Sequence, residues 1–254
     1  MASQINLMWI MIAAMLAIGS GCAGTRSATR SMTSLVPARN DARAQHLREW
    51  NEWADNHLQN GDIVFMRGDC LMLLGTVNFS ELSTDLTASR FSHIGIVATE
   101  EGQTYIYDIR SKGCIRTRFG ELLADRDLHQ VAIKRHRDLT PEALTEVAAF
   151  GQGVYRRREK YDDQLKLDND RLYCSEMVEN SYQQVGVKLS DPIAIQDLPN
   201  YERHLQAIKF VRAITSIEPD QEVLVPGNEQ IGIWANPALN LVLDCPDTKA
   251  LPPR

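Results

Sequence analysis

Two β-rich runs joined by a short turn do most to limit how this chain can fold. SHIGIVA (92–98) and QTYIYDIR (103–110) are separated by only four residues, TEEG (99–102), which is a hairpin signal. Strands joined by so short a turn pair side by side and antiparallel. Further β-rich runs at 62–66 and 130–135 alternate with helical patterns, so the sequence predicts an α+β fold built on an antiparallel sheet.

Helical patterns lie on either side of these runs. A stripe of apolar residues predicts a helix over 43–58, and Thr140 followed by Pro141 marks the N-terminus of a second helix. The long stretch 67–91 is expected to be a loop with one helical turn. The run 207–214 is expected to be a late strand.

The third helix begins at a cysteine. In RLYCSEMVENSY (171–182), apolar residues recur at helical spacing after Cys174, and Gly186 stands where a left-handed C-cap would lie. A thiol in the first turn faces the positive end of the helix dipole and several free backbone N–H groups, which favour a thiolate and can bind an oxyanion. Two interpretations stay open at this point: a nucleophile, or a buried apolar thiol.

His93 is the histidine best placed to serve as a base for that thiol. The other histidines lie on the first helix, beside another strand or in a charged stretch, whereas His93 opens a strand and Gly95 leaves space above the same sheet face. A two-residue turn at 100–101 would place Asp108 opposite His93, at a distance that orients the ring. A three-residue turn at 100–102 would instead send Asp108 to the other face.

Four motifs carry a resemblance to a known family. They are GDIVF (61–65), SHIGIV (92–97), YD (161–162) and YCSEMV (173–178). Together they resemble the permuted papain-like amidases of the YiiX/YaeF type, relatives of NlpC-type cell-wall hydrolases, over about residues 60–215.

The resemblance implies a circularly permuted papain-like (NlpC-type) fold, in which the antiparallel sheet packs against the nucleophile helix. It also implies Cys174 as nucleophile, His93 as base and Asp108 as the acidic residue that orients the base. The family usually has glutamate at the place of Asp108, so the orienting side chain here is shorter.

The N-terminal run LMWIMIAAMLAI (7–18) predicts an export signal, because it is apolar and of signal-peptide length. Gly19, Ser20 and Gly21 before Cys22 resemble a bacterial lipobox, in which the cysteine carries the lipid. We therefore expect a lipoprotein anchored through Cys22 in a membrane of the bacterial cell envelope and facing the periplasm. Another exported form and a cytosolic protein are the alternatives.

These signals divide the chain into four parts. The stretch 23–42 is rich in Ser, Thr and Arg, which predicts a flexible tether. The parts are a signal or lipoprotein segment (1–22), the tether (23–42), the papain-like catalytic domain (43–215) and an irregular C-terminal extension (216–254).

Composition excludes some classes of function. The formal net charge of -6 argues against a general nucleic-acid binder, and the basic cluster at 156–160 is interpreted as a solvated helix face.

The aspartates at 162, 163, 168 and 170 lack the spacing of a calcium-binding loop and are interpreted as a solvated loop. Cys70, Cys114 and His129 lack zinc-ligand spacing, so neither a metal nor an organic cofactor is expected. An exported chain could also pair two of Cys70, Cys114 and Cys245, but the sequence does not choose the pair.

Three hypotheses of function follow. The first is a cell-envelope cysteine hydrolase that cleaves an amide bond, in a peptidoglycan peptide or another acylated envelope substrate, through a thioester. The second is a lipid-directed acyltransferase or esterase with the same triad, which the apolar stretch 70–79 favours. The third is a non-catalytic binding lipoprotein, in which Cys174 serves packing or a disulfide.

Overall fold

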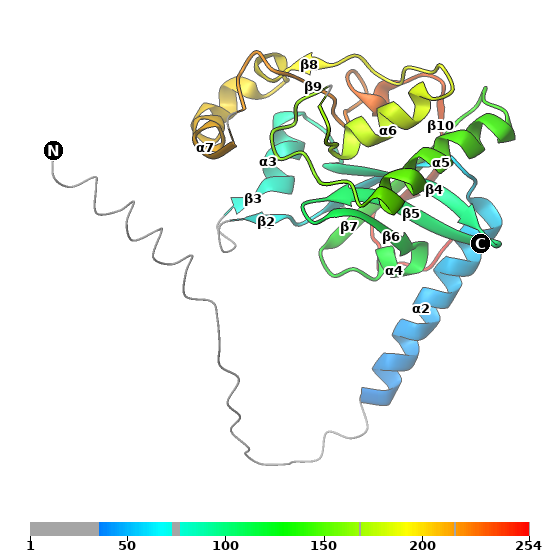
Figure 1. Ribbon diagram of the computed structural model, residues 1–254. Helices are drawn as coiled ribbons and strands as arrows, with labels where there is room; N and C mark the ends of the chain where they lie inside the picture. Colours follow the sequence, from blue (N-terminus) through cyan, green and yellow to red (C-terminus); the bar gives the residue numbers. More distant parts are fainter. Residues whose placement is uncertain (1–35, 73–76, 168, 216, 254) are drawn as a thin grey trace, which may run out of the picture. The chain divides into compact units, whose positions relative to one another are not determined.

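A six-stranded antiparallel sheet forms the centre of the structure (Figure 1). The computed structural model describes residues 36–72, 77–167, 169–215 and 217–253. The strands follow the order β10-β7-β1-β4-β5-β6. Their bounds are Ile63–Gly68 (β1), His93–Glu100 (β4), Gln103–Arg110 (β5), Gly113–Arg118 (β6), Leu128–His136 (β7) and Leu239–Cys245 (β10). The antiparallel sheet predicted from the hairpin is confirmed.

Helices cover both faces of this sheet (Figure 1). On one face lie α5 (Pro141–Arg157) and α6 (Cys174–Gln183). On the other lie α2 (Val36–His57) and α4 (Phe119–Leu123). Each pair of helices shares a cluster of buried apolar side chains with the strands, so the sheet is buried on both sides.

Strand β1 shows how the sequence produces this layering. Successive side chains of a strand point to opposite faces. Ile63 and Phe65 belong to the cluster under α5 and α6, whereas Val64 and Met66 belong to the cluster under α2. Because both faces are covered, the strand is an unbroken apolar run rather than an alternating one.

The two helices that flank the candidate site begin where the sequence signals predict. In α5, Pro141 is the first residue, and Thr140 Oγ1 accepts a hydrogen bond from the Ala143 N–H at 3.3 Å. Helix α6 begins at Cys174. Gly186, just beyond its end, has the left-handed conformation expected of it, with φ of +74°.

One prediction of secondary structure is wrong and another is incomplete. The run 207–214 is not a strand but lies within helix α7 (Leu205–Thr215), which continues directly from a 3₁₀ turn, η2 (Tyr201–His204). The spacing of a short apolar run does not distinguish a strand from a helix. The stretch 67–91 also has more structure than one helical turn, since it contains β2 (Leu71–Met72), β3 (Val77–Asn78) and α3 (Phe79–Leu86).

The C-terminal segment 216–254, predicted to be an irregular extension, instead completes the sheet. Strand β10 pairs with β7, and a register shift between Leu241 and Leu243 breaks the alternation that would have revealed it. Lys134 on β7 fixes the segment that leads into β10, because its Nζ donates a hydrogen bond to the Trp234 carbonyl at 2.6 Å. The short elements nearby are β8 (Ile193–Ala194), η1 (Ile195–Asp197), β9 (Glu222–Val223) and η3 (Ile233–Ala235).

The N-terminal predictions lie mostly outside the described residues. Residues Asn40–Arg254 form one compact unit, to which the sheet belongs. The predicted signal segment with Cys22 is not described, but residues 36–42, assigned to the tether, form the start of α2. Within the described residues, every helix is too short or too polar to cross a membrane.

Candidate active site

Cys174 is the first residue of α6 and is buried in the core cluster that this helix shares with the sheet. Tyr173 before it is extended, with φ of -109° and ψ of 175°, and so directs the chain sharply into the helix. The first N–H groups of a helix have no partner within it, and here they lie at the thiol. Tyr173 is itself fixed, since its hydroxyl accepts a hydrogen bond from the Leu224 N–H at 2.7 Å.

The loop before Cys174 is organised by a buried carboxylate. Asp162 is 2% exposed and accepts hydrogen bonds from the N–H groups of Gln164 at 2.9 Å and Lys166 at 2.8 Å. Its own N–H donates to the Leu172 carbonyl at 2.9 Å, which brings the two ends of the loop together. The prediction of a solvated loop is therefore wrong for Asp162. Its carboxylate is buried and stabilises the loop that leads to Cys174.

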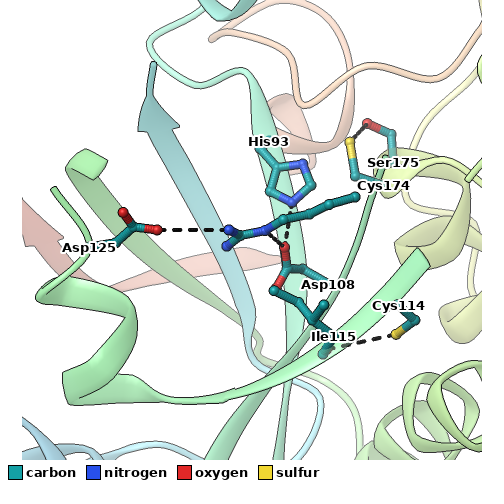
Figure 2. Close-up of polar contacts among 8 residues, drawn as sticks. His93, Asp108, Cys114, Ile115, Asp125, Cys174 and Ser175 are labelled. Atoms are coloured by element: carbon teal, nitrogen blue, oxygen red, sulfur yellow. Dashed lines mark hydrogen bonds and ion pairs between the residues drawn. The ribbon is translucent and has the colours of Figure 1, made fainter. Parts of the chain in front are cut away.

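His93 lies between Asp108 and Cys174 (Figure 2). It is the first residue of β4, and its Nε2 donates to Asp108 Oδ2 on β5 at 2.7 Å. Figure 2 shows the other ring nitrogen on the side of the Cys174 sulfur. The structure thus brings together the three residues that the sequence singled out.

The contact between His93 and Asp108 forms in a register that the sequence did not predict. The hairpin turns at Glu101 and Gly102, both with positive φ, and pairs Glu100 with Gln103. Asp108 therefore faces Gly95 rather than His93, and reaches the ring diagonally across the strands.

Gly95 is necessary for this arrangement. A Cβ atom at position 95 would lie 2.7 Å from the Tyr107 carbonyl oxygen and 2.9 Å from the Asp108 Cβ. Both distances are too short for real atoms, so any side chain here would displace β5. The space that glycine leaves is occupied by Asp108.

We expect Gly95→Ala to lower the free energy of unfolding by about 1–3 kcal/mol, because the added methyl group overpacks the sheet. Urea denaturation measures this change. Gly153→Ala in α5 is the matched control: its Cβ would meet only the flexible end of Arg157, at 3.0 Å. Equal denaturation midpoints for the two variants would contradict the role of Gly95.

The electrostatics of the pair favour a thiolate beside an imidazolium. Burial raises the pKa of the Cys174 thiol, but the charge and hydrogen bond of His93, together with hydrogen bonds from the Ile94 backbone and from Ser175, bring that pKa below its usual value. Burial lowers the pKa of His93, but the charge of Cys174 and the hydrogen bond to Asp108 raise it to about 9. Each group thus stabilises the charged form of the other.

Arg110 is a charged neighbour that the sequence reading missed. Its Nε donates to Asp108 Oδ2 at 2.5 Å, the same oxygen that binds His93. Burial raises the pKa of Asp108, but His93 and Arg110 outweigh this effect and keep the pKa below its usual value. Since alternate residues of a strand share a face, Arg110 could have been found from its position two residues after Asp108.

Tyr161 is a second missed neighbour, although its motif had been noted. It is half-buried against the core cluster that contains Cys174, and it forms a parallel bridge with Leu172. Burial and the charge of Cys174 raise the pKa of the Tyr161 phenol, so it stays protonated. The loop that Asp162 organises therefore carries a protonated phenol that feels the charge of Cys174.

The other cysteines and the GDIVF motif lie outside the group formed by Cys174, His93 and Asp108. Cys70, Cys114, Cys174 and Cys245 are all free thiols. Asp62 of the GDIVF motif is buried and accepts hydrogen bonds from Arg135, with two contacts of 2.7 Å. That motif therefore secures the start of β1.

A thiol at a helix N-terminus, packed on an antiparallel sheet with its histidine on an earlier strand, defines a papain-like cysteine hydrolase of permuted order. Residues 57–221 match the model of the family described as "Permuted papain-like amidase enzyme, YaeF/YiiX, C92 family". The chain belongs to this family of papain-like cysteine peptidases and amidases.

A solved structure shares the fold. The chain resembles metalloprotein yiiX from Escherichia coli O157:H7 with a TM-score of 0.60 and 22% identity, over 74% of this chain and 98% of that one. No curated protein matches the chain. That relative is called a metalloprotein, but in the described part of this chain no three His, Cys, Asp or Glu side chains lie together as a metal site requires.

Proposed function

We propose that this protein is a cell-envelope cysteine hydrolase that cleaves an amide bond through Cys174, His93 and Asp108. The observation that carries the proposal is the hydrogen bond of 2.7 Å between His93 and Asp108, with the other ring nitrogen on the side of Cys174. The substrate would be a peptidoglycan peptide or another acylated envelope molecule. Support for the envelope is the apolar run 7–18 followed by Cys22.

The reaction follows from the charges of the site. The Cys174 thiolate adds to the amide carbonyl carbon, and the carbonyl electrons move to oxygen. When the tetrahedral intermediate collapses, the C–N bond breaks and the His93 imidazolium gives its proton to the leaving amine. Water, deprotonated by the now neutral His93, then cleaves the thioester, which releases the acid and restores the thiolate–imidazolium pair. Asp108 holds the ring in place throughout.

Two donors are available to the oxyanion of the intermediate. The backbone N–H of Cys174 lies in the first turn of α6, where the helix dipole favours negative charge. The Tyr161 hydroxyl, which stays protonated and feels the charge of Cys174, is the second. Both act on charge that exists only in the transition state and the intermediate.

We expect Tyr161→Phe to lower kcat about 100-fold, because it removes one oxyanion donor. KM and the rate of Cys174 alkylation should change little, since the thiolate does not depend on that donor. Steady-state kinetics and iodoacetamide labelling measure these quantities. Tyr155→Phe on α5, a residue that is 40% exposed, is the control. A loss of alkylation as large as the loss of kcat would show that Tyr161 supports the fold instead.

Product analysis tests the proposed function. Purified protein would be incubated with muropeptides and, separately, with phospholipids and acylated lipoproteins, and the products identified by mass spectrometry. The expected result is an amide divided into an amine and a carboxylate, with the gain of one water. Released fatty acid without amide cleavage would favour the lipid-directed alternative. No product from any substrate, with Cys174 reduced, would overturn the proposal.

A further inference from the structure

A row of ion pairs extends from the His93–Asp108 contact to Arg110 and Asp125. Four side chains connected by polar contacts alternate in sign: His93 is positive, Asp108 negative, Arg110 positive and Asp125 negative. The Arg110 guanidinium stands between the two carboxylates, 2.5 Å from Asp108 and 3.8 Å from Asp125. The thiolate of Cys174 extends the alternation on the other side of His93.

Asp108 depends strongly on the two cations. It is 0% exposed, so its charge has lost the hydration that water would give. Its Oδ1 has no hydrogen-bond partner among the described residues, and both contacts fall on Oδ2. When His93 gives up its proton during the reaction, Arg110 is the cation that still touches this carboxylate.

We propose that Arg110 is a positioning residue of the site: it holds the Asp108 carboxylate against His93 and offsets its buried charge, so that His93 can release its proton to the leaving amine. The inference rests on the proposed function. Asp108 alone would hold the imidazolium proton more tightly, because a bare buried carboxylate attracts it without compensation. The Arg110 guanidinium reduces that attraction, because its positive charge lies against the same carboxylate oxygen that binds His93.

Charged and titratable side chains from several elements surround His93 and Asp108. The charged and titratable neighbours are Cys174 on α6, Asp108 and Arg110 on β5, Cys114 on β6, which feels the charge of Asp108, Asp125 after α4, Tyr161 in the loop before α6, and Cys70, which feels the charge of Arg110. Arg110 is 37% exposed, so solvent reaches one side of it while its Nε stays on Asp108.

The test compares Arg110→Met, which removes the charge, with Arg110→Lys, which keeps it. The titration of His93 is followed by NMR on ¹⁵N-histidine protein, with the signal assigned from its loss in His93→Gln. We expect the midpoint to move up by about one pH unit in Arg110→Met and to stay close to the original in Arg110→Lys. Asp125→Asn is the control and should change little, because Asp125 is 41% exposed and its contact is long.

The outcomes separate two kinds of failure. A midpoint that is unchanged or lower in Arg110→Met, or one that moves equally in both Arg110 variants, overturns the role of Arg110 while the hydrolase proposal stands. If Cys174 of the unaltered protein reacts with iodoacetamide no faster at neutral pH than an ordinary thiol, the thiolate itself is absent and the proposed function fails. Thermal denaturation of each variant shows whether the fold is intact.

Discussion

Cys174→Ala is expected to reduce hydrolysis by about 10⁴-fold or more while the protein stays folded. The substitution removes the sulfur that forms the thioester, and no other described cysteine lies beside His93. The cost to stability should be small, because only one buried atom is lost from the first turn of α6. Hydrolysis of the substrate found by product analysis measures the first effect, and circular dichroism with thermal denaturation measures the second.

Two further variants make this result specific. Cys174→Ser keeps the size and polarity of the side chain but gives a hydroxyl, which His93 does not ionise at neutral pH, so it should be as inactive as the alanine variant. Cys114→Ala removes a half-buried thiol whose pKa burial raises to about 12, and it should retain activity. Activity preserved in Cys174→Ala would mean that the residue serves packing and not nucleophilic attack.

The second large effect concerns His93. We expect His93→Gln to lower the rate of hydrolysis by about 10³-fold or more, because it removes the general acid and base and the cation that stabilises the thiolate. Alkylation of Cys174 by iodoacetamide should then require alkaline pH, as for an ordinary thiol. In the unaltered protein the pair is charged from below the usual thiol pKa up to the pKa of His93 at about 9, so activity should decline as pH rises through that value.

A surface histidine provides the control for this experiment. His129→Gln on β7 removes a ring that is 49% exposed, and it should leave both the rate and its pH dependence unchanged. If the alkylation profile of His93→Gln matched that of the unaltered protein, another group would have to account for the lowered pKa of Cys174.

The helix of the site could be predicted because its signals are local. Helical spacing after Cys174 and a glycine beyond the last turn describe α6 without any knowledge of the rest of the chain. The same holds for α5, where Thr140 and Pro141 mark the first turn. Such signals depend on residues close in sequence, so a single chain is enough to read them.

The register of the hairpin illustrates what the sequence does not determine. Glu101 adopts a left-handed conformation with φ of +51°, which a non-glycine residue rarely does, and this moves the turn by one residue. The pairing changes by two positions, an even number, so Asp108 stays on the face of His93. The predicted contact is present, although the predicted register is wrong.

Arg110 and Tyr161 were missed for different reasons. Arg110 shares a strand with Asp108, and alternation alone would have placed it on the same face. Tyr161 depends on how the loop around Asp162 folds, and no periodic pattern describes such a loop. Residues brought to a site by irregular segments are therefore the ones that a single sequence reveals least.

The position of β10 has a practical consequence for anyone who shortens this chain. The family match ends at residue 221, before the strand at Leu239–Cys245. A protein cut at that boundary would leave the backbone groups of β7 without their neighbour, an exposed edge of the kind that promotes aggregation. It would also uncover Phe65 and Phe91, on which the Trp234 ring packs at 5.0 and 5.1 Å between centroids. The smallest well-behaved domain therefore extends well past the limit that family similarity suggests.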